Sequence, residues 1–242
     1  MNISEVFYSI QGEGKRSGFP SFFIRTNFCN LRCSFPQGLC DTAYTSWDPY
    51  DEKNVGKMSV DEILNEYKKY SPADVVITGG EPAIQAKELT QLCKSLKEFN
   101  KNIFITLETN GTIFDEFAEH INLLSISPKL KSSIPTGTKF EEIHESARYN
   151  FGALDKFSKM HKAGKIDIQW KFVFTGENDM TEILDLQDVM DIKNSDIYLM
   201  PEGITEEQLS KTRRITAEQA LSRHFNYTER LHILIWGNKR GV

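Results

Sequence analysis

The sequence predicts an α/β fold in which strands alternate with helices, as a mainly parallel sheet or an open barrel. Three observations predict it. Short apolar, β-branched segments recur along the chain, amphipathic stretches fall between most of them, and polar motifs follow several of them. The apolar segments are residues 21–26, 74–78, 103–107, 123–126, 168–174, 197–200 and 231–236. A length of 242 residues suits one large unit, so we expect residues 1–242 to form a single domain.

Helices are predicted between the apolar segments. Residues 59–62 (SVDE) form a capping-box pattern, and apolar side chains follow with the spacing of one helical face at Val60, Ile63, Leu64 and Tyr67. Residues 89–99 repeat this spacing and include Cys93, which we therefore expect to be a small buried apolar side chain and not a metal ligand. Further helices are predicted near residues 112–120, 140–162, 180–192 and 205–225.

The overall charge indicates a small-molecule partner. A net charge of −5 and a pI near 5.6 argue against a binder of nucleic acid or of anionic membranes, because either would show a basic face. The sequence shows no leader, no lipidation signal and no apolar run near the roughly 20 residues that cross a bilayer, so we expect a cytoplasmic protein. A reducing compartment would leave its four cysteines free to bind metal.

Three of those cysteines, Cys29, Cys33 and Cys40, crowd one short stretch after the apolar segment 21–26. Three thiolates are one too few for a closed four-ligand site, so the trio predicts a metal centre with one open position. The alternative is a structural zinc site with a distant fourth ligand. Zinc sites usually use Cys-x2-Cys pairs, and the five histidines form no paired pattern, whereas a cubane iron–sulfur cluster takes three thiolates at three corners.

Polar motifs also follow the next strands. They are residues 78–82 (TGGEP), 108–112 (ETNGT) and 127–129 (SPK), and a further polar turn, 9–14 (SIQGEG), follows a short apolar run. Loops that leave the carboxyl ends of parallel strands meet at one rim, so we expect the motifs at 78–82, 108–112 and 127–129 to converge with the cysteines. Each motif alone is also compatible with an ordinary turn. Without side chains, Gly79 and Gly80 would let the backbone approach a charged ligand group.

Taken together, these residues resemble the radical S-adenosylmethionine superfamily, which has a three-cysteine loop after its first barrel strand and a Gly-Gly-Glu-Pro stretch after its second. Within it, the pattern is most similar to the family of 7-carboxy-7-deazaguanine synthases. The similarity lies in residues 7–14 (FYSIQGEG), Arg25, and residues 29–31, 40–42, 78–82, 108–111 and 127–129. It implies an open, partial βα barrel of the radical SAM type.

Two features depart from the family pattern. Six residues separate Cys33 from Cys40, where the family usually has two between its second and third cysteines or a longer insertion earlier in the motif. Because Asp41 and Thr42 follow Cys40 as the pattern requires, we retain Cys40 as the third ligand. The C-terminal segment 231–242 also lacks the Gln-x-His sequence with which many members end. The resemblance therefore does not identify the residues that close this side of the substrate pocket.

The resemblance implies a [4Fe–4S] cluster on Cys29, Cys33 and Cys40, S-adenosylmethionine on its open iron, and Mg²⁺ at Thr42. It implies a carbon–nitrogen lyase that converts 6-carboxy-5,6,7,8-tetrahydropterin to 7-carboxy-7-deazaguanine with loss of ammonia, in the biosynthesis of queuosine and other deazapurines. It further implies a homodimer and an external one-electron reductant of the flavodoxin or ferredoxin type.

The resemblance also assigns the other site residues. Those implied to bind S-adenosylmethionine are Gly79, Gly80, Glu81, Glu108, Asn110, Ser127, Pro128 and Lys129. Those implied to bind substrate are Ile10, Gln11, Gly12, Glu13, Arg25, Thr78 and Pro201. Arg25 would pair with the substrate carboxylate, which suits a guanidinium that donates two parallel hydrogen bonds.

Two other functions fit parts of the sequence. A glycyl-radical-enzyme activase has a similar cysteine loop and glycine motif, but its substrate is a protein. The turn at residues 11–14 (QGEG) and Arg25 favour a small carboxylated heterocycle over a protein loop. A zinc-stabilised binding module is the non-enzyme alternative.

Overall fold

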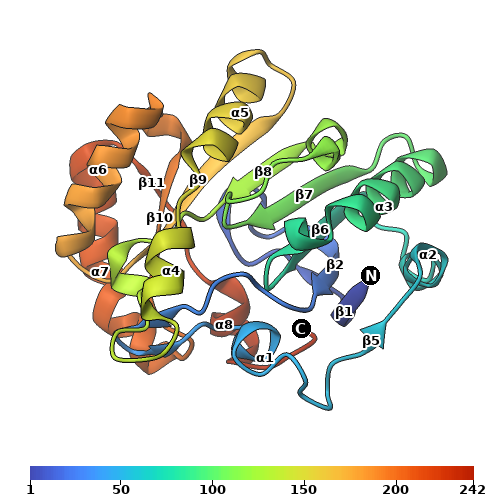
Figure 1. Ribbon diagram of the computed structural model, residues 1–242, viewed down its shortest axis with the longest axis horizontal. Helices are drawn as coiled ribbons and strands as arrows, with labels where there is room; N and C mark the ends of the chain where they lie inside the picture. The colour runs from blue at the N-terminus through green and yellow to red at the C-terminus, as the bar shows by residue number, and fades with distance from the viewer.

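The central feature of the fold is a nine-stranded sheet with the order β11-β10-β9-β8-β7-β6-β2-β1-β5 (Figure 1). It is seen in a computed structural model that describes residues 1–242. Its strands are β1 (Asn2–Ile10), β2 (Pro20–Thr26), β5 (Gly56–Lys57), β6 (Asp74–Gly79), β7 (Phe104–Thr109), β8 (Leu123–Ile126), β9 (Asp167–Phe174), β10 (Ile197–Pro201) and β11 (Asn226–Tyr227). From β2 to β11 every pairing is parallel, whereas β1 is antiparallel to both β2 and β5. The end strands β5 and β11 do not pair, so the predicted mainly parallel, open arrangement is confirmed.

Helices of nine or more residues cover the outer side of this sheet, and the shorter helices lie toward its lower end in the view of Figure 1. The helices are α1 (Ala43–Ser46), α2 (Val60–Lys68), α3 (Ala86–Phe99), α4 (Glu141–Ala147), α5 (Phe151–Lys162), α6 (Asn178–Met190), α7 (Glu206–Arg223) and α8 (Leu231–Trp236). Short 3-10 helices lie at Gly14–Arg16, Pro82–Gln85, Glu116–His120, Lys131–Ser133 and Asn194–Asp196. Because the parallel strands follow in chain order, right-handed crossovers place the connecting helices on one side and leave the other side free for a site.

The helix predictions hold best where local signals are strong. The Ser59 side chain accepts a hydrogen bond from the Glu62 backbone N–H, and the Glu62 carboxylate accepts one from the Ser59 backbone N–H, which completes the predicted capping box. Cys93 is fully buried in the hydrophobic core on α3, as expected. No helix of the structure combines the length and the apolar character that a membrane span needs.

Three segment predictions were wrong in detail. Residues 231–236 form α8 and not a strand, because an apolar run this short does not by itself separate strand from helix. The long helix expected at 140–162 is broken into α4 and α5, where the Asn150 side chain caps α5 by accepting from the Ala153 N–H. Residues 112–120 form only the 3-10 helix Glu116–His120.

Several elements were not predicted at all. They are β1, β5, β11, α1 and a hairpin of β3 (Ser34–Phe35) and β4 (Gly38–Leu39) that forms from the insertion between Cys33 and Cys40. β1 is the most consequential of these, because its antiparallel pairing sets Ile10 opposite Pro20 and so places the 11–14 turn at the amino end of β2. The cysteine loop follows the carboxyl end of β2 at Thr26, and residues of both segments line the same cavity.

Candidate active site

A cavity lies where the carboxyl ends of the parallel strands meet the cysteine loop and α8. It is lined by residues from every predicted motif. Among the predicted site residues, only Glu81, Pro128 and Pro201 do not line it. The expected convergence of the motifs is therefore observed, and α8 lies beside α1 at the same end of the molecule (Figure 1).

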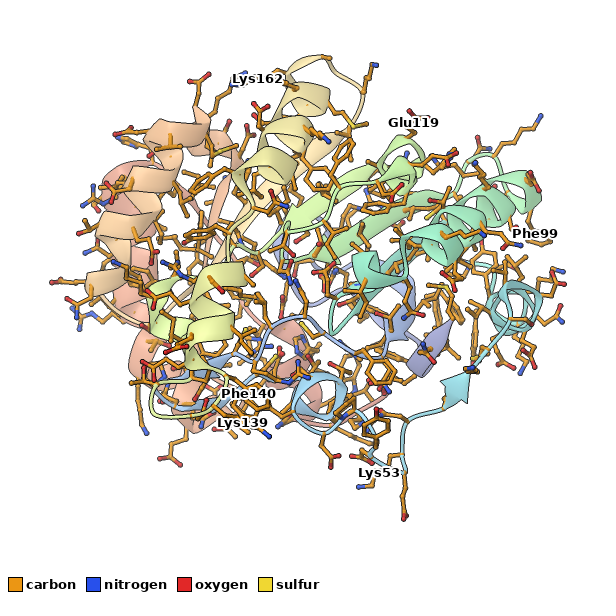
Figure 2. All side chains as sticks on the ribbon, in the orientation of Figure 1. Lys53, Phe99, Glu119, Lys139, Phe140 and Lys162 are labelled. Atoms are coloured by element: carbon orange, nitrogen blue, oxygen red, sulfur yellow. The ribbon has the colours of Figure 1, made fainter.

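The cysteine loop is held by contacts from three other elements. The Trp47 indole N–H donates to the Cys33 carbonyl at 3.0 Å, and the Arg32 backbone N–H donates to His144 Nδ1 on α4 at 3.2 Å. Asn30 Nδ2 donates to Thr112 Oγ1 at 2.9 Å. The rings of Trp47 and Phe140 also meet edge to face, with centroids 5.5 Å apart, and Figure 2 labels Phe140 beside this loop. These contacts anchor the loop to α4, to the residue after α1 and to the 108–112 turn.

The three thiols are free, and all of them line the cavity. Burial raises the pKa of Cys29 to about 12 and the pKa of Cys33 well above its ordinary value, since an isolated thiolate is poorly solvated there. A cationic metal centre would reverse this preference. No group of three Cys, His, Asp or Glu side chains is placed so that it could hold a single metal ion. A cubane cluster takes each thiolate on a different iron, so its ligands stand farther apart than those of one zinc ion, and the loop fits such a cluster.

The two glycines after β6 allow the cysteine loop to cross the strand end. A Cβ on Gly80 would lie 2.1 Å from the Phe28 carbonyl oxygen, and one on Gly79 would lie 2.2 Å from the Thr26 carbonyl oxygen. The Gly79 φ of 138° also favours glycine. The Glu81 N–H then donates to the Phe28 carbonyl at 2.9 Å. The two glycines thus let the backbone at the start of the cysteine loop pass close to the end of β6. Both glycines also line the cavity.

Glu81 lies beneath the cavity and organises the neighbouring turn. Its fully buried carboxylate accepts from the backbone N–H groups of Ala83 at 3.0 Å and Asn110 at 2.7 Å, and from Thr109 Oγ1 at 2.7 Å. Burial raises its pKa. Glu81 therefore supports the 108–112 turn and does not itself face the cavity.

The wall beside Cys29 and Cys33 carries the residues predicted to bind S-adenosylmethionine. Lys129 Nζ donates to Ser127 Oγ at 2.8 Å, and Asn110 Nδ2 donates to Asn30 Oδ1 in the cysteine loop at 2.9 Å. An ammonium, a hydroxyl and an amide thus lie together, and such groups can bind a carboxylate and ribose hydroxyls. Pro128 lies between Ser127 and Lys129 without lining the cavity.

Arg25 lies in the cavity with part of its guanidinium free. Its Nε donates to Glu5 Oε1 at 2.8 Å, and the Tyr44 hydroxyl donates to the same oxygen at 2.8 Å. The two terminal nitrogens of Arg25 make no hydrogen bond within the protein. They are the pair of donors that a bound carboxylate requires.

A buried network of charged side chains surrounds Glu13 on the 11–14 turn. Glu13 Oε2 accepts from Lys171 Nζ, and Glu13 Oε1 accepts from Arg230 Nε at 3.1 Å. Arg230 also donates to the Gly203 carbonyl at 2.6 Å and to the Asp41 carboxylate. Burial, the largest influence, would raise the pKa of Glu13, but Lys171 and Arg230 outweigh it and lower the pKa to about 2. Glu13 is therefore ionised at neutral pH.

The comparisons with known proteins agree with this geometry. The model of the radical SAM superfamily matches residues 23–164. A 7-carboxy-7-deazaguanine synthase from Halobacterium salinarum is 39% identical over 98% of this chain and 90% of the relative's length. The chain belongs to the 7-carboxy-7-deazaguanine synthase family of radical SAM proteins.

A second family member, from Rhodopirellula baltica, is 35% identical over 99% of this chain and 88% of its own length. The crystal structure of QueE from Escherichia coli superposes with a TM-score of 0.66 and covers 96% of this chain and 94% of that one. At 23% identity this likeness shows a shared fold. The open α/β architecture is thus the one expected for the family.

The insertion that departs from the usual family pattern closes one side of the cavity. Gln37, in the β3–β4 hairpin, donates to the Glu202 carboxylate at 2.8 Å and to the Gln208 carbonyl at 3.2 Å. Gln208 Nε2 donates back to the Gln37 carbonyl at 2.9 Å. Phe35 and Leu39 of the hairpin line the cavity. The hairpin therefore joins the cysteine loop to the segment between β10 and α7.

Several cavity residues of this family member were missed by the sequence analysis. They are Asp41, Lys171, Glu202, Arg230, His232 and Val242. Asp41 belongs to the 40–42 motif but was given no role, and Lys171 had a weaker signal, because a lysine in the apolar segment 168–174 breaks its hydrophobic pattern. Glu202 lines the cavity next to the predicted Pro201, which is buried at the end of β10. Leu231 N–H donates to the Gly12 carbonyl at 3.0 Å, which brings His232 against the 11–14 turn.

Proposed function

We propose that this protein is a radical SAM lyase that converts 6-carboxy-5,6,7,8-tetrahydropterin to 7-carboxy-7-deazaguanine with loss of ammonia. Membership of the family supports the reaction. The observation that carries the proposal is one cavity that joins three free thiols to the 11–14 turn and to the open fork of Arg25. A carboxylated heterocycle would contact both the turn and the fork.

The residues divide the work of binding. Cys29, Cys33 and Cys40 would hold the [4Fe–4S] cluster, and Gly79, Gly80, Asn110, Ser127 and Lys129, which all line the cavity, would bind S-adenosylmethionine. Glu108 would lie between the two ligands, since it accepts from Gln11 and Thr78 of the substrate side. When bound, the cluster supplies the electron that cleaves S-adenosylmethionine and so starts the abstraction of a substrate hydrogen. The protein's own task is to place one C–H bond of the substrate correctly and to exclude water and other hydrogen donors.

The substrate side uses charge and hydrogen bonds. Arg25 would bind the carboxylate with its two free terminal nitrogens. Glu13 would accept hydrogen bonds from the pterin ring, and Gln11 would donate to it. Thr78 lies beside them, since its Oγ1 donates to Glu108 Oε2 at 2.8 Å. The β3–β4 hairpin would close the cavity over the bound ligands.

The remaining assignments follow the family resemblance. Thr42 would help hold Mg²⁺, a cation that keeps few protein ligands and uses substrate oxygens and water. Thr42 is buried and lines the cavity, with its Oγ1 3.4 Å from Cys40 Sγ. We also propose a cytoplasmic homodimer that receives electrons from a flavodoxin or ferredoxin. A hydrophobic cluster that runs from Ile3 to Phe225 supports one domain over residues 1–242.

Anaerobic turnover tests the proposal. Protein reconstituted with iron and sulfide, and supplied with S-adenosylmethionine, Mg²⁺, a reductant and the tetrahydropterin, should form 7-carboxy-7-deazaguanine and ammonia. Arg25→Gln should raise KM for the pterin by about 100-fold, because it removes a charge-assisted pair, and should leave cluster loading unchanged. If 5′-deoxyadenosine forms without any deazaguanine, the protein acts on another substrate and the proposal is wrong.

A further inference from the structure

β9 brings one charged side chain to the inner side of the sheet. Ile168, Trp170, Phe172 and Phe174 belong to the hydrophobic core. Lys171 alternates with them and lines the cavity, with a side chain that is only 6% exposed. A lysine this buried is costly unless its charge is paired. Its partners therefore indicate what it does.

Lys171 lies between two carboxylates of the cavity. Its Nζ donates to Glu13 Oε2 and lies 3.7 Å from Glu108 Oε1. Glu108 Oε1 also accepts from Gln11 Nε2 at 3.2 Å. Glu13 and Glu108 come from different elements, the 11–14 turn and β7, so one ammonium fixes their separation.

We propose that Lys171 is a positioning residue for substrate specificity, which holds the side chains of Glu13 and Glu108 as a pair of hydrogen-bond acceptors facing the N–H edge of an amino-oxo-pteridine ring. The inference rests on the proposed function and names the residue that prepares its substrate pocket. An ionised carboxylate only accepts hydrogen bonds, and the amino and ring N–H groups of such a heterocycle only donate them. A protonated carboxyl group would instead direct an O–H toward an N–H.

The charges around Glu13 determine how strongly Lys171 is needed. Lys171 faces Glu13 from β9, and Asp41 faces it from the segment before α1. His232 faces Glu13 from α8, and Arg230 faces it from the residue before α8. Burial raises the pKa of Glu13, and the two permanent cations outweigh this effect. Burial also lowers the pKa of His232, so His232 supplies little charge at neutral pH. Removing Lys171 therefore leaves Arg230 alone against burial and Asp41, and the pKa of Glu13 rises.

Binding of 6-carboxypterin, the fully oxidised and unreactive analogue, tests the inference. Calorimetry would use anaerobic, cluster-loaded protein with S-adenosylmethionine, at about pH 5.5 and about pH 7.5. For Lys171→Met, the affinity relative to wild type should fall at least about tenfold more at the lower pH than at the higher one, because each pKa unit crossed is a tenfold change in the ionised fraction. Ionisation of the analogue itself cancels in this ratio.

Two variants separate charge from structure. Lys171→Arg keeps a positive charge and should follow the wild-type pH profile within about twofold. Lys162→Met makes the same chemical change at an exposed pair with Asp191, at the opposite end of the molecule from Phe140 (Figure 2), and should bind as wild type does. If Lys171→Met does not fold, Lys171→Gln carries the same prediction, because it keeps a hydrogen-bond donor without the charge.

Parallel pH profiles for wild type and the folded uncharged variant would overturn the inference while leaving the proposed function intact. A uniform loss of affinity at both pH values would do the same, since it indicates lost packing only. Wild-type protein that fails to bind 6-carboxypterin would overturn the proposed function and this inference with it.

Discussion

The two walls of the cavity are built in different ways. The motif wall contains the lining residues up to Lys129, which come from strand ends and from the turns beside them, where glycine, asparagine and cysteine occupy particular places. The closing wall consists of Lys171, Val173, Met200, Glu202, Gly203, Ile204, Arg230, His232 and Val242. It has no motif, and it meets the motif wall through ion pairs with Glu13 and Asp41. Local backbone geometry thus shapes one wall, and paired charge holds the other against it.

The largest expected effect lies in the motif wall, at Cys33. Cys33→Ala should abolish loading of the iron–sulfur cluster, because two thiolates cannot hold it at three corners. The fold should survive, since the Cys33 carbonyl keeps its hydrogen bonds from Trp47 and from the Cys40 N–H. Iron content and the thermal midpoint measure the two effects.

Cys93→Ala is the matched control for Cys33→Ala. It removes an equally buried thiol from the core on α3, so it should load iron fully and lose about 1 kcal/mol of stability. Full iron content in Cys33→Ala would show that Cys33 is not a ligand.

The next effect tests whether backbone proximity shapes the motif wall. Gly80→Ala places a Cβ 2.1 Å from the Phe28 carbonyl, a backbone atom that must move with the cysteine loop. We expect cluster loading to fall severalfold and the free energy of unfolding to drop by about 2–4 kcal/mol. Gly176→Ala, where nothing lies within 4 Å, should leave cluster loading unchanged and should change the free energy of unfolding by less than about 0.5 kcal/mol. Equal behaviour of the two variants would contradict the close-approach argument.

Arg230→Met tests the charge that holds the closing wall. It leaves the carboxylates of Glu13 and Asp41 with one fewer cation in a buried site, and should lower the free energy of unfolding by about 3 kcal/mol. Urea denaturation measures this loss. Arg214→Met removes an exposed pair with Glu218 and should cost less than about 0.5 kcal/mol. A loss below about 1 kcal/mol in Arg230→Met would mean that the ion pairs of Arg230 do not hold the two walls together.

The smallest effect depends on pH and concerns an anchor of the motif wall. Burial lowers the pKa of His144 from 6.5 to about 4, and its Nδ1 accepts from the Arg32 N–H in the cysteine loop. As the pH falls from 6.5 toward 4, the unfolded chain binds a proton that the folded protein resists, so stability is lost, by about 3 kcal/mol at most. His144→Gln should lack this step. Unfolding curves with the same pH slope in both proteins would rule out His144 as its source.

Prediction from sequence followed the same division as the walls. Residues such as Cys33, Gly80 and Glu13 could be placed because each belongs to a short motif next to a strand. Arg230 carried no such signal, because it precedes a short apolar run that predicts a strand and instead forms α8. The role of Gln37 could not be predicted either, because its partners Glu202 and Gln208 lie about 170 residues away.

Local sequence was enough to predict the alternation of strands and helices, the cysteine loop and the turns of the motif wall, because hydrophobic periodicity and turn chemistry act over a few residues. Which charges meet depends on how distant parts of the chain fold together. Lys171 and Arg230 reach Glu13 from 158 and 217 residues along the chain. Their effect on that carboxylate exists only once folding has removed water from between them, because burial strengthens the interaction of charges that water would screen.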